Sequence, residues 1–140
     1  MTQKDKGLLL KDLCARLVYG VKLKIKHYDD VWELLAIYTN GTTYATRDIG
    51  YPIETYFEDC KPYLFPLSSM TEEQREELYK IGWYLDEDKI YTCFRNYDDA
   101  NYKTHTDCLE LINWCYKNNF DINGLIPKGL AENATDKNIY

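Results

Sequence analysis

The chain has 140 residues, a hydrophobic fraction of 45% and a formal net charge of −6. This is the size of one ordinary domain, and the composition is that of a globular protein, which argues against disorder. A nucleic-acid binder needs clustered Lys and Arg to neutralise phosphates, so we expect no binding to a DNA or RNA backbone. The sequence predicts a single domain over residues 1–140, with a loosely held tail over residues 128–140.

The apolar run near the N-terminus is interrupted at Lys11 and Asp12. A signal peptide needs an unbroken apolar region, and a membrane span needs about 20 apolar residues. We therefore expect no membrane segment and a cytoplasmic location. The five cysteines are scattered, form no CxxC pair, and are expected to be reduced thiols.

The first third of the chain changes from helical to alternating periodicity. Apolar residues within 8–17 are spaced for one face of a helix, and Gly20 is placed to end it. Residues 21–26 alternate Val, Leu and Ile with three lysines, which predicts a strand with one solvated face. Asn-Gly at positions 40–41 lies between two β-prone runs, over residues 31–39 and 42–47, and predicts a hairpin with a type I′ turn.

The middle of the chain contains one strong helix signal. Thr71 and Gln74 have the spacing of a capping box, which predicts a helix that Gly82 limits. Before it, residues 53–60 are compatible with a strand or a helical turn. Pro62 and Pro66 bracket a segment expected to be extended.

The last third adds a turn, a strand and a helix. A turn is expected at residues 86–88, a strand at 89–95 and a polar loop at 96–101, and Thr104 or Thr106 is expected to cap a final helix. Together these elements predict an α+β fold. In it, a small and mostly antiparallel sheet carries an N-terminal, a central and a C-terminal helix packed on it.

Tyrosine is the unusual component, with 14 Tyr beside 3 Trp and 4 Phe. Tyrosine has an apolar ring and a polar hydroxyl, so it suits half-buried sheet surfaces and also binding faces. The first interpretation is that Tyr covers the sheet, and the second is an aromatic surface for a ligand or partner.

No arrangement of residues predicts catalysis. The chain has two histidines, His27 and His105, and His105 lies three residues before Cys108. This spacing permits a Cys–His pair, but His105 is expected to face solvent and Cys108 to lie on the apolar stripe of its helix. We expect no metal and no cofactor, because ligand pairs with zinc spacing, calcium loops and phosphate-binding glycine loops are all missing from the sequence.

Several blocks of the sequence resemble a family of uncharacterised proteins that is abundant in Bacteroides-type bacteria and in their phages and prophages. These blocks are Leu8–Val21 (LLLKDLCARLVYGV), Lys61–Glu73 (KPYLFPLSSMTEE), Ile112–Trp114, Asn119–Asp121 and Gly124–Ala131 (GLIPKGLA). The chain departs from the family pattern at Val18, where the family has proline. The resemblance implies a phage-associated or mobile-element origin and the cytoplasm of a bacterial host, and it implies no particular activity.

Three functional hypotheses follow. The first is a non-catalytic accessory protein that binds a host protein, for example to antagonise defence. The second is a protein that sequesters a small nucleotide-like signal, which would form homo-oligomers; Arg47, Lys61 and Arg95 are its candidate phosphate contacts and Tyr63 its candidate aromatic contact. The third is an enzyme that uses Cys108 and His105.

Overall fold

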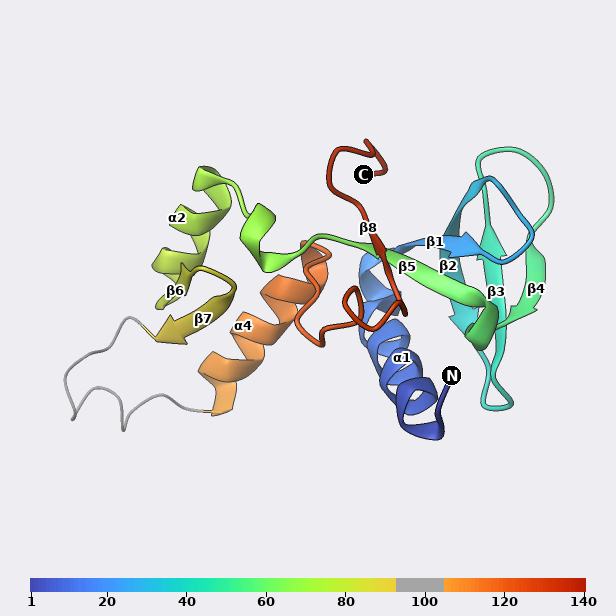
Figure 1. Ribbon diagram of the computed structural model, residues 1–140, viewed down its shortest axis with the longest axis horizontal. Coiled ribbons are helices and arrows are strands. Elements are labelled where there is room, and N and C mark those ends of the chain that lie inside the picture. Colours follow the sequence, from blue (N-terminus) through green and yellow to red (C-terminus); the bar gives the residue numbers. More distant parts are fainter. Residues whose placement is uncertain (93–104) are drawn as a thin grey trace. The chain divides into compact units, whose positions relative to one another are not determined.

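A computed structural model describes residues 1–92 and 105–140, with the side chains of 1–92 and 108–140. The described chain forms two compact units. Unit 1 comprises Met1–Leu64 and Asn123–Tyr140, and unit 2 comprises Phe65–Ile122. The fold class is confirmed as α+β: the described residues form three helices, a mostly antiparallel six-stranded sheet and a separate hairpin (Figure 1). The prediction of one domain with a loose tail stays a prediction.

The sheet of unit 1 is built from six short strands in the order β4-β3-β2-β1-β5-β8. Their bounds are β1 Lys22–Ile25, β2 Val31–Ile37, β3 Thr42–Thr46, β4 Ile53–Tyr56, β5 Cys60–Leu64 and β8 Glu132–Asn133. The first four strands form an antiparallel meander, and β5 returns to pair with β1. Strand β8 then adds to β5 in parallel. The chain therefore leaves the sheet after β5, forms unit 2, and returns to complete the sheet.

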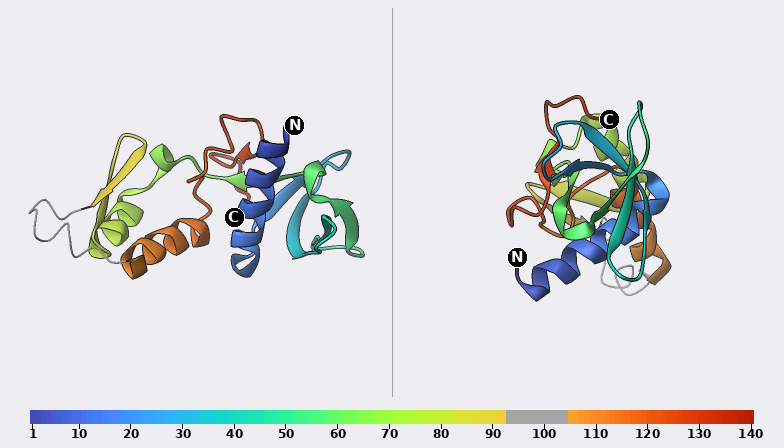
Figure 2. Two further views of the ribbon diagram at one scale, coloured as in Figure 1. Left: turned by 90° about the horizontal axis from the view of Figure 1, so that it is seen from below. Right: turned by 90° about the vertical axis from the view of Figure 1, so that its right-hand side faces the viewer.

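Helix α1 covers one face of this sheet (Figure 2). It spans Gln3–Arg16, starting earlier than the predicted residue 8 because the Thr2 hydroxyl caps the Asp5 N–H at 3.0 Å. Leu9 and Leu13 are fully buried with the inward-facing residues of β1 and β2. After a 3₁₀ turn, Gly20 adopts φ 78°, so the predicted glycine stop is confirmed.

The hairpin at Asn40-Gly41 is confirmed, but its turn type was predicted wrongly. Of the two central residues only Gly41 has positive φ, at 86°, whereas a type I′ turn needs both. The Gly41 N–H donates to the Tyr38 carbonyl at 2.9 Å, and the Asn40 side chain accepts from the Thr42 N–H at 2.9 Å. This is a type I turn followed by a left-handed glycine, the three-residue alternative for joining two strands.

Residues 53–60 combine both structures that the sequence left open, since β4 is followed by a 3₁₀ turn over Phe57–Asp59. The capping box is confirmed. Thr71 and Gln74 exchange hydrogen bonds of 3.2 and 2.9 Å at the start of α2, which spans Glu72–Lys80.

Unit 2 has its own core. Its elements are α2, a hairpin of β6 (Trp83–Asp86) with β7 (Lys89–Thr92), and α4 (His105–Lys117). They surround the buried side chains of Leu78, Leu85, Cys115 and Phe120. The sequence missed β6, and the last part of the predicted strand 89–95, the loop 96–101 and the cap at Thr104 lie outside the described residues.

A buried ion pair anchors α1 in unit 1. The Asp12 carboxylate accepts hydrogen bonds from Arg16, at 2.6 Å to Nε and 3.1 Å to Nη2, and both side chains are fully buried. The Asn123 amide donates to the same carboxylate at 2.8 Å. Because Asn123 begins the returning segment, this cluster joins the two sequence segments of unit 1.

We predict that Asp12→Ala lowers the free energy of unfolding by roughly 3–5 kcal/mol, because it leaves the Arg16 cation buried without its carboxylate. Urea unfolding followed by circular dichroism measures this change. The matched control is Asp5→Ala, a half-buried position on the same helix whose ion pair with Lys128 is long at 3.9 Å, with an expected loss below about 1 kcal/mol. The double variant Asp12→Leu/Arg16→Met should lose less than Asp12→Ala. Equal losses in Asp12→Ala and Asp5→Ala would contradict the anchoring role.

Candidate functional site

The strand register divides the outward face of the unit 1 sheet into two halves. One row runs Tyr38–Thr42–Tyr56 and the next runs Ala36–Tyr44–Glu54, across β2, β3 and β4. Further along the same strands the outward face becomes charged. Here Lys22 is opposite Glu33, and Lys24 lies between Val31 and Lys61. We call the first half the tyrosine face, defined by Tyr38, Tyr44 and Tyr56.

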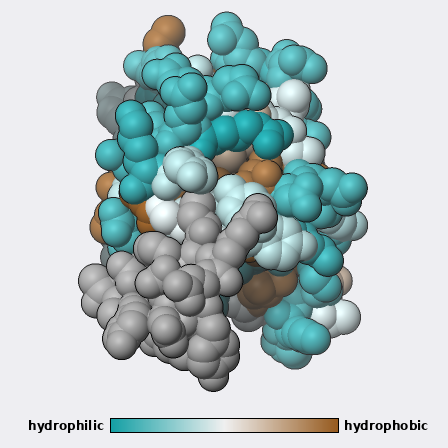
Figure 3. Space-filling view, turned by 90° about the vertical axis from the view of Figure 1, so that its left-hand side faces the viewer, coloured by the Kyte–Doolittle hydropathy of each residue, from teal (hydrophilic) through white to brown (hydrophobic). Residues whose placement is uncertain are grey.

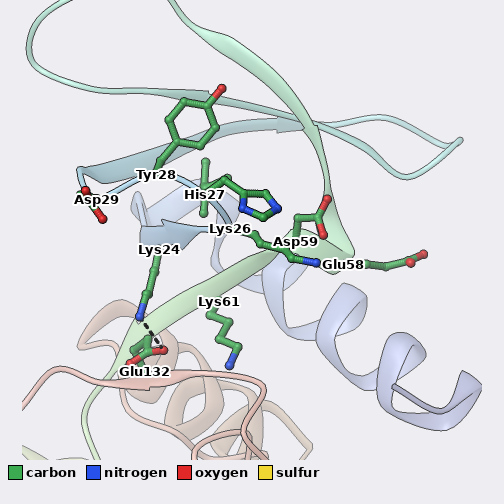
Figure 4. A pocket seen from close by; sticks show the side chains of 10 residues that line it. Lys24, Lys26, His27, Tyr28, Asp29, Glu58, Asp59, Lys61 and Glu132 are labelled. Atoms are coloured by element: carbon green, nitrogen blue, oxygen red, sulfur yellow. Dashed lines mark hydrogen bonds and ion pairs between the residues drawn. The ribbon is translucent and has the colours of Figure 1, made fainter.

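The charged half borders an open groove of about 520 Å³ (Figure 4), here called the lysine groove. Its walls come from β1, the turn after it, the 3₁₀ turn before β5, and β5 and β8. The lining residues are Lys24, Ile25, Lys26, His27, Tyr28, Asp29, Glu58, Asp59, Lys61 and Glu132.

The charges of the groove are only partly paired. Lys24 Nζ lies 3.4 Å from the Glu132 carboxylate, and Glu58 is paired outside the groove with Lys6 at 3.3 Å. Lys61 has no ion pair within the described part of the chain. It lies directly opposite Lys24 in the β1–β5 ladder, and two like charges in this position repel.

The turn between β1 and β2 brings a second unfavourable feature to the same groove. His27 has φ 70°, a left-handed conformation that costs free energy for a residue other than glycine. Its side chain is exposed in the groove (Figure 4), next to Tyr28, whose ring meets the ring of Trp32 edge-on at 5.4 Å. The lysine groove therefore combines a strained turn with a repulsive lysine pair, as functional sites often do.

The tyrosine face has the opposite character, because its side chains support one another. The rings of Tyr38 and Tyr44 meet edge-on with centroids 5.9 Å apart. Glu54 lies opposite Tyr44 in the β3–β4 ladder, and its interaction with the Tyr44 hydroxyl raises the pKa of Tyr44 above its ordinary value. Tyr38 and Tyr56 remain 52% and 63% exposed.

The structure separates the four residues predicted to bind a ligand. Lys61 lines the lysine groove, and Tyr63 follows two residues later on β5. Arg47 follows β3, where its guanidinium pairs with Asp30 and lies 5.0 Å from the ring centroid of Trp32. Arg47 is not among the residues that line the lysine groove. Arg95 lies outside the described residues.

Tyr63 is largely covered, so its ring is a poor surface for stacking a base. The pKa of Tyr63 is raised, mainly by burial. Its carbonyl accepts a hydrogen bond from the Tyr140 hydroxyl at 2.8 Å, and that hydroxyl accepts from the Lys22 N–H at 3.0 Å. Burial raises the pKa of Tyr140 to about 12. The C-terminal residue thus bridges β5 and β1.

The sequence analysis did not predict either surface as a unit. Residues 38, 44 and 56 come together because β3 pairs with β2, across a bulge between Leu34 and Ala36, and with β4. The spacing of these residues along the chain does not predict this. Lys24 and Lys61 likewise lie opposite each other only because β1 pairs with β5. The available signal was the alternation within 21–26, which correctly put three lysines on a solvated face.

Unit 2 carries the net charge of the protein. Residues 65–122 contain 6 basic and 12 acidic residues, whereas unit 1 contains 11 of each. Exposed acids include Glu72, Glu73, Glu76 and Glu77 of α2, and the face of unit 2 in Figure 3 is mostly hydrophilic. An apolar groove of about 410 Å³ lies between β7 and α4, lined by Leu67, Ile90, Leu111 and Ile122 among others.

The described thiols and acidic groups offer little for catalysis or metal binding. Burial raises the pKa of Cys60 to about 12, so this thiol stays protonated. Cys108 is half-buried on α4, and the side chain of His105 is outside the described part, so the Cys–His pair stays a prediction. Over the described side chains, no three His, Cys, Asp or Glu residues are grouped to hold a metal ion.

Comparison with protein-family models, with curated proteins and with solved structures finds no match for this chain. None of the helices in the described residues is long and apolar enough to cross a membrane.

We predict that Lys61→Gln raises the free energy of unfolding by about 0.2–1 kcal/mol, because it removes the repulsion from Lys24 across the ladder. Lys11→Gln, at an exposed position of α1, is the matched control and should stay within about 0.5 kcal/mol of the wild type. Both are measured by urea unfolding. A lower free energy of unfolding in Lys61→Gln would contradict this prediction. It would show that attraction between Lys61 and nearby carboxylates outweighs the repulsion from Lys24.

Proposed function

We propose that this chain is a non-catalytic, phage- or prophage-associated accessory protein that acts in the cytoplasm of a bacterial host by binding a host protein. The tyrosine face is the proposed binding surface. The observation that carries the proposal is the outward cluster of Tyr38, Tyr44 and Tyr56 on three paired strands. Antagonism of a defence protein is one activity that such binding would serve.

The chemistry of the face suits a protein interface. Tyrosine is enriched in interface cores, because it supplies a large contact area with only two side-chain torsions to fix. Here the strands hold the backbone, and the ring contact between Tyr38 and Tyr44 restricts the side chains before any partner arrives. Binding to such a surface costs little conformational entropy.

Glu54 also gives the face a polar group. Its side chain is exposed and lies opposite Tyr44 in the β3–β4 ladder. A partner with an apolar patch beside a Lys or Arg would match this arrangement, since the cation would meet the Glu54 carboxylate beside the tyrosine rings.

The experiment is affinity capture from host lysate with wild-type protein and with Tyr38→Ala/Tyr56→Ala. We expect a specific partner that the double variant binds at least tenfold more weakly, as loss of interface tyrosines implies. The matched control is Tyr79→Ala, an exposed tyrosine on α2 in unit 2, which should bind like the wild type. If Tyr38→Ala/Tyr56→Ala retained the partner as well as Tyr79→Ala does, the interface would lie outside the tyrosine face. The absence of any specific partner would reject the proposal.

A second candidate function, the sequestering of a small nucleotide-like signal, is favoured by one observation. In the lysine groove, Lys61 lies opposite Lys24 without an ion pair of its own, and Tyr28 lines the same groove. A phosphate would relieve the repulsion between the two lysines, and Tyr28 is available to stack on a base. Four carboxylates also line the groove and would repel a phosphate, which counts against this function.

The second candidate predicts that a panel of mono-, di- and cyclic nucleotides contains one that raises the melting temperature. In isothermal calorimetry, Lys61→Ala should then weaken binding of that nucleotide by about tenfold or more, as loss of a charged hydrogen bond implies. Lys11→Ala is the control and should leave binding unchanged. If no nucleotide at millimolar concentration shifts the melting temperature, this function is excluded.

A further inference from the structure

The last strand of the sheet, β4, has a free edge in the described structure. It pairs with β3 on one side only, and it ends the strand order (Figure 1). The Phe57 N–H donates to the Gly41 carbonyl at 3.1 Å, which identifies that pair as hydrogen-bonded. Because such pairs alternate along an antiparallel ladder, Ile53 and Thr55 bond to β3, while the N–H groups of Glu54 and Tyr56 point outward.

This edge has few of the features that keep edge strands apart. Natural sheets protect their edges with lysines, bulges or inward charges, and β4 contains none of these. Its protective features are its length of four residues, the charge of Glu54 and the preceding Pro52. The exposed side chains on it and just before it are mostly apolar. Ile49, Tyr51 and Tyr56 are 83%, 90% and 63% exposed. Such an edge is a template for adding another strand.

The sequence of β4 is complementary to itself in one register. Antiparallel pairing of two copies through outward residues gives three symmetric choices. Placing Glu54 opposite its own copy opposes two carboxylates and also sets Pro52, which has no N–H, against Tyr56. Placing Tyr56 opposite its own copy sets Glu54 against Glu58. Only the third register, with Glu54 opposite Tyr56, avoids both conflicts.

We propose that two copies of this chain associate through β4, in antiparallel register, with Glu54 opposite Tyr56 of the partner subunit. In this register Glu54 and Tyr56 exchange N–H and carbonyl groups twice about the two-fold axis. The Tyr56 carbonyl already accepts the Cys60 thiol of its own chain at 3.6 Å, so it would take the partner's N–H on its second lone pair. Thr55 then lies opposite Thr55 of the partner subunit, which is a favourable cross-strand pair. The two six-stranded sheets would then form one continuous sheet across the two-fold axis.

The charge distribution is compatible with this pairing. Unit 1 has equal numbers of basic and acidic residues, so two unit 1 sheets meet without net repulsion. On the outward face, the Glu54 carboxylate would lie between Tyr44 of its own chain and Tyr56 of the partner subunit. The two tyrosine faces become one surface about the two-fold axis.

The first test is the oligomeric state by analytical ultracentrifugation from 1 to 100 μM. We expect a dimer of the 16.6 kDa chain. Glu54→Pro removes an outward N–H and the carboxylate but no hydrogen bond to β3, so it should weaken the dimer at least tenfold and leave the circular dichroism spectrum unchanged. Glu54→Gln keeps the N–H and should dimerise like the wild type. A wild-type protein that is monomeric at 100 μM, or a Glu54→Pro dimer as tight as that of the wild type, would overturn the proposal.

A cross-linking test fixes the register and does not depend on the fold of the proline variant. Thr55 and its copy would form a non-hydrogen-bonded pair with Cα atoms about 4.5 Å apart, within disulfide range. In a Cys14→Ser background, which removes an exposed thiol, Thr55→Cys should oxidise to a covalent dimer. Ile53→Cys in the same background is the control, because residue 53 would face residue 57. Equal cross-linking of the two variants, or none for Thr55→Cys, would rule out this register.

Discussion

Unit 1 depends on the buried contact that Asp12 makes with Arg16 and Asn123. Two fully buried charges are stable only when their hydrogen bonds are satisfied, and the Asp12 carboxylate takes donors from its own helix and from Asn123. Asn123 is the first residue after unit 2, so the cluster is complete only when the chain has returned. The buried Asp12 carboxylate therefore links the first segment of unit 1 to its last segment, which follows the 58 residues of unit 2.

The returning segment also decides which part of the sheet is left open. Strand β8 pairs with β5, and the Tyr140 hydroxyl bridges β5 and β1 where their ladder ends. These contacts cover Tyr63 and supply Glu132 to the lysine groove. The far side of the sheet receives no such cover, so β4 keeps a free edge and Tyr56 stays exposed. The charged surface therefore lies on the side of the sheet that the returning segment covers, and the aromatic surface lies near the β4 edge.

Local signals in the sequence predicted local structure well. The capping box at Thr71, the hairpin at Asn40-Gly41 and the alternation before Lys26 each depend on a few neighbouring residues, and each is found. Features that depend on distant pairing were not predictable. Strand β8 has two residues and exists only because β5 is beside it. Arg47 and Lys61 were reasonable candidates for one site as exposed cations, but the strand register sends Arg47 to Asp30 and Trp32.

The division of charge changes what the overall composition means. A net charge of −6 argues against a polyanionic partner for the whole chain, but it resides in unit 2, while unit 1 is neutral. The repulsion expected between acidic molecules therefore does not act directly between two unit 1 sheets. If β4 edges pair, each dimer presents two tyrosine faces in fixed relation, and a partner with repeated sites would bind both with the avidity of a linked pair. Self-association through the β4 edge would then fix the distance between the two faces that bind the partner.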